Sequence, residues 1–278
     1  MSDYPMNETS RPPPLPVELY SHIFTFVDSH TYLRRLCLVS RAFYHAAVPF
    51  VYHTIHLDYS DRQIKRLRLI IRTNPELALH VRELTLIPGY LSEGSTIDLA
   101  EEIFTSLHNL RVLTIDSLLH DFKDFTRITR NCRSQLHTLH NKYVHLTDYL
   151  PFLKSQSNIT NWTHLAANRD LTLLENSLPN LTTMCVEASL LRCFTTPRPV
   201  KQLYVCYDPF SYADPGLEDS IPLGPFRDTL ATLSWDRSLS WGSVGGPAAI
   251  SSIAEQVPHL KHLCVIDVPD DVTEVRNG

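Results

Sequence analysis

The segment Leu107-His108-Asn109-Leu110-Arg111-Val112-Leu113-Thr114-Ile115 carries the pattern that decides the fold. Apolar residues stand at its fourth, seventh and ninth positions, and its end alternates between apolar and polar residues. Such alternation predicts a short strand with one buried face. The same order, with a similar lead-in, returns at Leu178–Val186 and at Val257–Val265. A pattern that returns along a chain is typical of a repeat architecture.

The repeat extends over most of the chain when its apolar positions are aligned. In each copy the first, fourth and sixth residues are apolar, and the copies follow one another at roughly 20 to 30 residues. Clear copies begin at Val81, Leu110, Leu181, Val200, Leu230 and Leu260, and weaker copies begin at Leu136 and Ile159. Between them, Leu99–Leu107 and Ile250–Val257 hold apolar residues at helical spacing. Strands that alternate with helices predict an α/β fold.

Residues 81–278 therefore resemble leucine-rich repeats of an irregular kind. The resemblance implies an α/β solenoid, in which each strand contributes to a concave sheet and is backed by a helix. The asparagine that such repeats often place after the strand is mostly absent here. A plain α/β fold is therefore the alternative to a solenoid.

A second region, residues 15–57, contains three short predicted helices. Pro16 suits the first turn of a helix, because its missing N–H has no partner there in any case. Ser40 is a suitable N-cap for the third helix. Apolar residues of the first two helices recur at helical spacing: Leu19, Ile23, Phe26, Leu33, Leu36 and Val39.

The order of blocks in this region resembles an F-box. The matching blocks are Leu15-Pro16-Val17-Glu18-Leu19, Ile23-Phe24, Leu33-x-x-Leu36-x-Leu38-Val39-Ser40-Arg41 and Pro49-x-Val51-Tyr52. One departure is Phe43, where the family commonly has a tryptophan. The resemblance implies a three-helix F-box motif that docks on a Skp-type adaptor of a cullin–RING ubiquitin ligase. The adaptor-facing positions that it implies are Leu15, Pro16, Leu19, Ile23, Leu33, Leu36 and Val39. Packing within the motif's own core is the alternative for single members of this set.

The remaining segments complete the predicted domain organisation. Residues 1–14 are polar and rich in proline, and we expect a disordered leader. Residues 58–80 are expected to form a helix that links the F-box to the repeat domain.

Composition excludes several classes of function. The chain has 25 Lys and Arg against 30 Asp and Glu, a net charge of −5, which argues against a nucleic-acid or membrane surface as the main partner. No apolar run approaches the roughly 20 residues that span a membrane. The six cysteines form no Cys-x-x-Cys pair, which favours a reducing compartment. We expect a cytoplasmic or nuclear protein, or one present in both compartments.

Motifs for bond chemistry are missing from the sequence. There is no His-Glu-x-x-His, no Gly-x-Ser-x-Gly and no phosphate-binding glycine loop. Three histidine pairs are spaced three residues apart within predicted strands, where the two side chains point to opposite faces. We therefore expect no metal, no cofactor and no catalysis, with an unrecognised hydrolase as the less favoured alternative.

The predicted concave face supplies candidate substrate contacts. Acidic residues recur after several predicted strands, and an acidic rim would favour a basic partner. The alternative is that these acids are solvated loop residues. The candidate substrate-binding residues are Asp116, Glu187, Tyr204, Asp236 and His262.

These observations lead to one expected function. The chain is expected to recruit a protein substrate to a Skp–cullin–F-box ubiquitin ligase, with the F-box on the adaptor and the repeat domain on the substrate. A non-catalytic repeat scaffold without a role in degradation is the main alternative.

Overall fold

The computed structural model describes residues 15–58, 61–87, 94–116, 125–142, 144–166, 177–206, 221–237 and 246–266. The chain divides into two compact units, Met1–His53 (unit 1) and Thr54–Gly278 (unit 2). The leader expected at residues 1–14 lies outside the described residues. The boundary between the units falls a few residues before Leu57, at which the F-box segment was expected to end.

The described part of unit 1 consists of three short helices, α1 (Val17–Phe24), α2 (His30–Leu36) and α3 (Arg41–Val51). Pro16 precedes α1 with φ at −54°, a value already suited to a helix start. The Ser29 hydroxyl accepts a hydrogen bond from the Tyr32 N–H at 3.5 Å, and Ser40 accepts one from the Phe43 N–H at 3.2 Å. Each serine thereby satisfies one backbone donor that the helix cannot.

The core of unit 1 is small and aromatic. The Phe43 ring lies 4.7 Å from the Tyr20 ring and 5.5 Å from the Phe24 ring, measured between centroids. Phe43 thus fills the interior at the position where the resemblance led us to expect a tryptophan. The core cluster contains four buried residues: Phe24, Leu33, Ala46 and Ala47.

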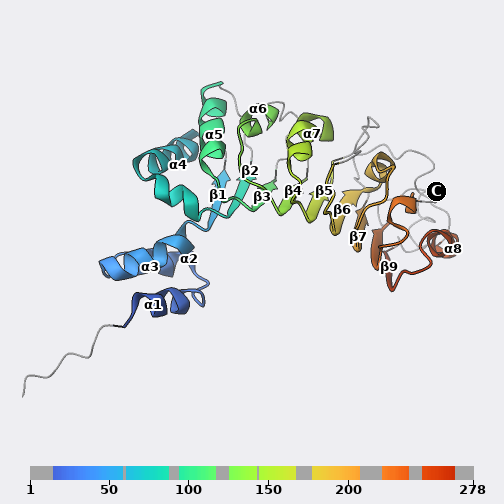
Figure 1. The fold of residues 1–278 in the computed structure, drawn as a ribbon, viewed down its shortest axis with the longest axis horizontal. Coiled ribbons are helices and arrows are strands. Elements are labelled where there is room, and N and C mark those ends of the chain that lie inside the picture. Colours follow the sequence, from blue (N-terminus) through green and yellow to red (C-terminus); the bar gives the residue numbers. More distant parts are fainter. Residues whose placement is uncertain are drawn as a thin grey trace, which may run out of the picture. The chain divides into compact units, whose positions relative to one another are not determined.

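Unit 2 is built on a parallel sheet of nine strands, whose order in space is their order in sequence (Figure 1). Neighbouring strands pair in parallel throughout. The strands are β1 (Thr54–Asp58), β2 (Glu83–Ile87), β3 (Val112–Ile115), β4 (Thr138–Asn141), β5 (Asn161–His164), β6 (Thr183–Glu187), β7 (Gln202–Cys206), β8 (Thr232–Asp236) and β9 (His262–Ile266).

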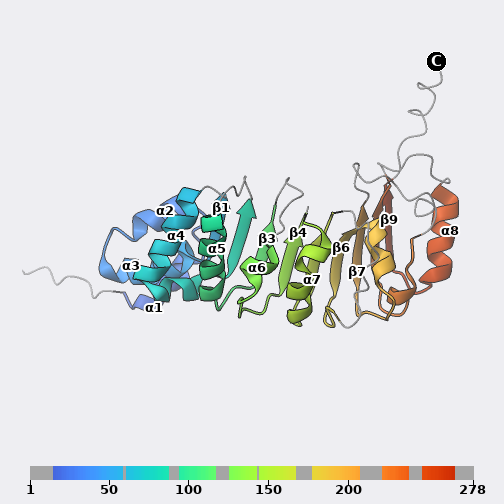
Figure 2. The same ribbon diagram turned by 90° about the horizontal axis from the view of Figure 1, so that it is seen from above.

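Helices connect the strands of unit 2. Figures 1 and 2 show α4 to α7 on the same side of the sheet. The helical segments are α4 (Asp61–Thr73), η1 (Pro75–His80), α5 (Gly94–Ser106), α6 (Phe125–Thr129), α7 (Leu146–Ser155), η2 (Ala188–Cys193), η3 (Gly224–Phe226) and α8 (Gly246–Gln256).

The repeat read from the sequence matches the register of the sheet. Within each copy, position 1 is its first apolar residue, which is Val81 for β2. The residues at position 4 pair from strand to strand and are buried from β2 to β8: Leu84, Leu113, Leu139, Trp162, Met184, Leu203 and Leu233. At the edge strand β9 the equivalent Leu263 is 38% exposed. The weak copies at Leu136 and Ile159 form β4 and β5 as regularly as the strong ones form their strands.

Asparagine side chains tie neighbouring turns together before the strands. Asn109 Nδ2 donates to the Leu79 carbonyl at 2.8 Å, and Asn180 Nδ2 donates to the Ser157 carbonyl at 3.0 Å. Each bond joins one repeat to the turn before it. The asparagine that precedes the strand therefore connects neighbouring repeats in this protein, in which an asparagine after the strand is mostly absent.

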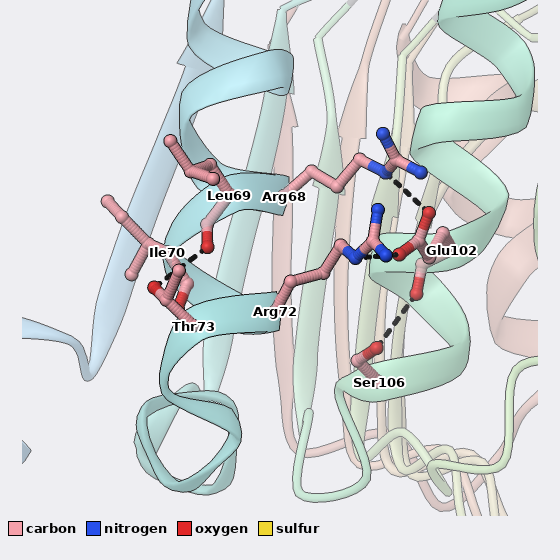
Figure 3. Close-up of polar contacts among 7 residues, drawn as sticks. All are labelled: Arg68, Leu69, Ile70, Arg72, Thr73, Glu102 and Ser106. Carbon is pink, nitrogen blue, oxygen red and sulfur yellow. Dashed lines mark hydrogen bonds and ion pairs between the residues drawn. The ribbon is translucent and has the colours of Figure 1, made fainter.

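The first two helices of unit 2 are held together by an ion pair. In Figure 3, Arg68 and Arg72 of α4 reach across to the carboxylate of Glu102 in α5. Ser106 Oγ donates to the Glu102 carbonyl at 2.9 Å one turn further along α5. α4, which the sequence analysis treated as a linker, is thus packed as part of the layer of helices behind the sheet.

Candidate adaptor-binding surface

Unit 1 exposes an unusual amount of apolar surface for its size. Ile23 of α1 is 50% exposed, and Leu38 in the turn after α2 is 86% exposed. Isolated apolar side chains on a surface are ordinary, whereas a group of them on so small a unit is typical of interaction surfaces. We call this group the apolar surface of unit 1; it consists of Leu15, Leu19, Ile23, Phe26, Tyr32, Leu38, Val39 and Tyr44.

The spacing within α1 explains part of this surface. Leu19 and Ile23 are four residues apart, which places them on one face of α1, and Phe26 follows in the turn after the helix. Phe24, directly beside Ile23, is buried in the core cluster. α1 therefore has apolar side chains on two faces: one face packs into the core of unit 1, and the other is exposed to solvent.

The structure separates the seven adaptor positions implied by the sequence into two groups. Five are exposed: Leu15, Pro16, Leu19, Ile23 and Val39. Leu36 is half-buried and packs against the core of unit 1. Leu33 is 5% exposed and is a member of that core, so its expected role as an adaptor contact is corrected to one of internal packing.

This geometry can be compared with known protein families. Residues 13–87 match the family model of the COS11 F-box domain. The N-terminal part of the chain is therefore similar to an F-box domain. The match covers all three helices of unit 1 and continues through β1, α4 and η1 to the end of β2.

Comparisons of the whole chain give less detail. None of the curated proteins matches it. Among solved structures, the leucine-rich repeat-containing protein LegL7 from Legionella pneumophila is similar, with 14% identity and a TM-score of 0.41 over 77% of this chain and 83% of that one. Unit 2 itself, with parallel strands in sequence order and helices on one side, is a leucine-rich-repeat-like α/β solenoid.

The predicted set left out four exposed large apolar residues of unit 1: Phe26, Tyr32, Leu38 and Tyr44. Phe26 continues the row of Leu19 and Ile23, so its spacing was a usable signal. Leu38 stands beside Val39 within a matched block of the F-box pattern. Tyr32 lies in the first turn of α2 and offered no comparable signal.

The predicted substrate contacts lie on the second unit and do not form one cluster. Tyr204 in β7, Asp236 in β8 and His262 in β9 come from successive strands, and Tyr204 and His262 are exposed. Asp116 follows β3, which is four strands away from β7 in the sheet. Its Oδ2 forms an ion pair with Lys142 Nζ at 2.9 Å, so much of its charge is compensated locally.

Glu187 has a different role from the one expected. Its side chain is only 2% exposed and accepts hydrogen bonds from the backbone N–H and the hydroxyl of Ser189. It thereby caps η2, the short helix that follows β6. Glu187 is therefore corrected from a substrate contact to a helix cap. With Glu187 buried and Asp116 paired, the acidic rim expected from the sequence has fewer free charges than the spacing of acids indicated.

A buried polar cluster lies in the middle of the solenoid. His164 Nδ1 lies 2.7 Å from the Tyr149 hydroxyl oxygen and 3.0 Å from Asn141 Nδ2, within hydrogen-bond distance of both. Burial, together with the charge of His145, lowers the pKa of His164 to about 3. Burial also raises the pKa of the Tyr149 hydroxyl. Both side chains are therefore neutral near pH 7. Asn141 also binds the backbone of Val144: its Nδ2 donates to the Val144 carbonyl, and its Oδ1 accepts from the Val144 N–H.

Metal sites and membrane-spanning helices are not found among the described residues. Among the residues that the structure describes, no group of three or more His, Cys, Asp or Glu side chains is arranged to hold a metal ion. Within the same residues, no helix has the length and apolar content required to cross a bilayer.

Proposed function

We propose that the chain recruits protein substrates to a Skp–cullin–F-box ubiquitin ligase. F-box domains generally bind Skp-type adaptors within cullin–RING ligases, and the match over residues 13–87 is the observation that carries the proposal. The apolar surface of unit 1 supports it, because the exposed residues include five of the positions implied by the family pattern.

The proposed mechanism involves no bond chemistry in this chain. Leu15, Leu19 and Ile23 would enter an apolar surface of the adaptor, where truncation of a buried anchor typically costs about 2 kcal/mol or more. The solenoid would hold a substrate close to the ubiquitin-loaded enzyme of the ligase. The rate gain comes from proximity, which turns a bimolecular encounter into an effectively intramolecular transfer.

The experiment that tests the proposal is co-expression with a Skp-type adaptor, followed by size-exclusion chromatography. The wild-type chain is expected to co-elute with the adaptor. The triple variant Leu15→Ala, Pro16→Ala and Ile23→Ala is expected to lose co-elution, because it removes exposed anchors and leaves the core of unit 1 intact.

A matched control removes the same kind of side chain elsewhere. Ile250, Leu263 and Ile266 are exposed apolar residues of unit 2 outside the matched residues 13–87, and their replacement by alanine is expected to leave co-elution unchanged. A wild-type chain that is soluble alone and ignores the adaptor would contradict the proposal. Co-elution without ubiquitination of any bound protein would favour the scaffold alternative.

We also propose that the protein acts in the cytoplasm, the nucleus or both. All six cysteines are free thiols, which is the usual state in a reducing compartment. Microscopy of a fluorescent fusion tests this, and a secreted fusion would contradict it.

A further inference from the structure

The residues that enter the strands form a second ladder along the amino edge of the sheet. They occupy position 2 of each repeat, and each backbone N–H donates to the carbonyl of its equivalent one strand earlier, at 2.7 to 3.0 Å. The ladder runs through Arg82, Arg111, His137, Thr160, Thr182, Lys201, Ala231 and Lys261. These bonds fix the eight residues at one register, so their side chains leave the sheet along a single line.

Five members of this ladder are basic, and we call them the amino rim: Arg82, Arg111, His137, Lys201 and Lys261. All are exposed except Arg82, which is half-buried and donates from Nη1 to the Asn109 carbonyl at 3.2 Å. Across the described ranges, none of the five takes part in an ion pair. The charges of the arginine and lysine members are therefore available to a partner.

The neighbouring positions do not offset this charge. From β3 to β9, positions 3 and 5 of the repeats hold no carboxylate, and threonine is the most frequent residue there. Glu83 in β2 is the exception, and its Oε2 accepts a hydrogen bond from Thr54 Oγ1 at 3.0 Å. The acids Asp116 and Asp236 stand at position 7, which is about 16 Å further along a strand. The basic side chains at position 2 thus lie at the amino end of the strands, where positions 3 and 5 from β3 to β9 bring no carboxylate, while the charge of Asp116 at the other end is paired with Lys142.

The spacing of the amino rim fits an extended chain laid across the strands. Neighbouring strands are about 4.8 Å apart, so Lys201 and Lys261, two strands apart, stand about 10 Å from each other. That distance is about three residues of an extended peptide. The whole rim, from β2 to β9, spans about 34 Å, or about ten residues.

We propose that the amino rim binds an acidic segment of a partner protein, about ten residues long and extended across the strands. This inference rests on the proposed function, because it assigns the substrate class that the solenoid recruits. It replaces the basic partner suggested by the spacing of acids in the sequence. Carboxylates would pair with the arginine and lysine side chains, and complementary charge would raise the association rate and select the partner.

The test uses a fluorescein-labelled peptide of twelve residues in which glutamate alternates with serine, measured by fluorescence anisotropy on the full chain. We expect saturable binding that weakens about tenfold or more between about 50 and about 300 mM salt. A peptide with lysine in place of glutamate is expected not to bind. A single-stranded nucleic acid of equal charge that binds more tightly than the acidic peptide would overturn the assignment to a protein segment.

Two variants with the same change in net charge locate the site. Arg111→Gln, Lys201→Gln and Lys261→Gln together remove three charges from the amino rim, and we expect about tenfold weaker binding of the acidic peptide. Arg62→Gln, Arg66→Gln and Lys154→Gln remove three exposed charges from α4 and α7, and we expect a change below about twofold. Equal losses in both variants, or no loss in the first, would overturn the proposal.

Co-elution with the adaptor is also measured for the amino-rim variant. This measurement distinguishes a failure of the rim proposal from a failure of the proposed function. Retained co-elution with the Skp-type adaptor together with lost peptide binding supports the rim as an independent site. Retained co-elution with unchanged peptide binding overturns the rim alone and leaves the proposed function in place.

Discussion

His164 shows how a single buried residue links the fold to pH. Its Nδ1 lies within hydrogen-bond distance of the Tyr149 hydroxyl and of Asn141 Nδ2, and a second proton on the ring would place a buried charge among these neutral groups. The pKa of His164 is lowered to about 3 from an ordinary value of 6.5. Between these two pH values the unfolded chain binds a proton that the folded chain does not, so the free energy of unfolding decreases as pH falls.

We predict that stability against urea decreases between about pH 7 and about pH 5, by up to about 1.4 kcal/mol per pH unit below 6.5 for this one group. The variant His164→Phe is expected to be less stable at pH 7, because the buried side chains of Tyr149 and Asn141 lose the ring nitrogen as a hydrogen-bond partner. Its further loss between pH 7 and pH 5 is expected to be smaller than that of the wild type.

The control for this prediction is His262→Phe, which changes an exposed histidine of β9. It is expected to keep the pH dependence of the wild type. If His164→Phe lost as much stability as the wild type over the same range, the buried histidine would not be the group responsible.

At the scale of residues, the sequence predicted which side chains are exposed for some positions and failed for others. The spacing of Leu19 and Ile23 was sufficient to place them on one face of a helix. It could not show that Leu33, at an equally regular position in the next helix, faces inward, because that depends on how α2 packs on α3. Glu187 was misassigned for a similar reason: an acid after a strand is exposed in most turns, but here the chain continues directly into η2.

At the scale of elements, the F-box helices combine a small core with a large exposed apolar surface. Phe24→Ala is predicted to unfold unit 1, because truncation of a buried phenylalanine typically costs about 3 to 5 kcal/mol and this core has few other buried side chains. Hydrogen exchange should then show unprotected amides in α1 to α3, while the amides of β3 to β8 stay protected.

This variant forms a pair with Leu15→Ala, Pro16→Ala and Ile23→Ala. Both are expected to lose the adaptor, but only Phe24→Ala should lose protection in unit 1. Loss of protection in the triple variant as well would mean that the exposed residues support the fold, and their assignment as adaptor contacts would then fail.

The elements themselves were largely predictable, since apolar alternation and helical spacing are local signals. The repeat pattern located β2 to β9, including the weak copies at Leu136 and Ile159. Residues 54–57 were assigned to the F-box segment, whereas in the structure they belong to β1, which pairs with β2 as the first strand of the sheet. Its sequence lacks the full repeat pattern, and strand pairing is not a local property.

At the scale of the whole molecule, the chain has two surfaces of opposite chemistry on two compact units. Unit 1 carries the apolar surface defined above, and burial of apolar side chains suits a stable docking interface. The sheet of unit 2 offers the basic amino rim, which suits the selection of a partner through charge. A recruiting subunit requires both functions on separate surfaces, and this separation could not be read from overall composition.

The measurement that tests the central claim most directly is hydrogen exchange of the full chain with and without a Skp-type adaptor. The account predicts slower exchange of the amides from Leu15 to Ile23 and around Leu38 and Val39 when the adaptor is present, with β4 to β8 unchanged. Protection confined to the strands of unit 2, or no change anywhere in the chain, would contradict it.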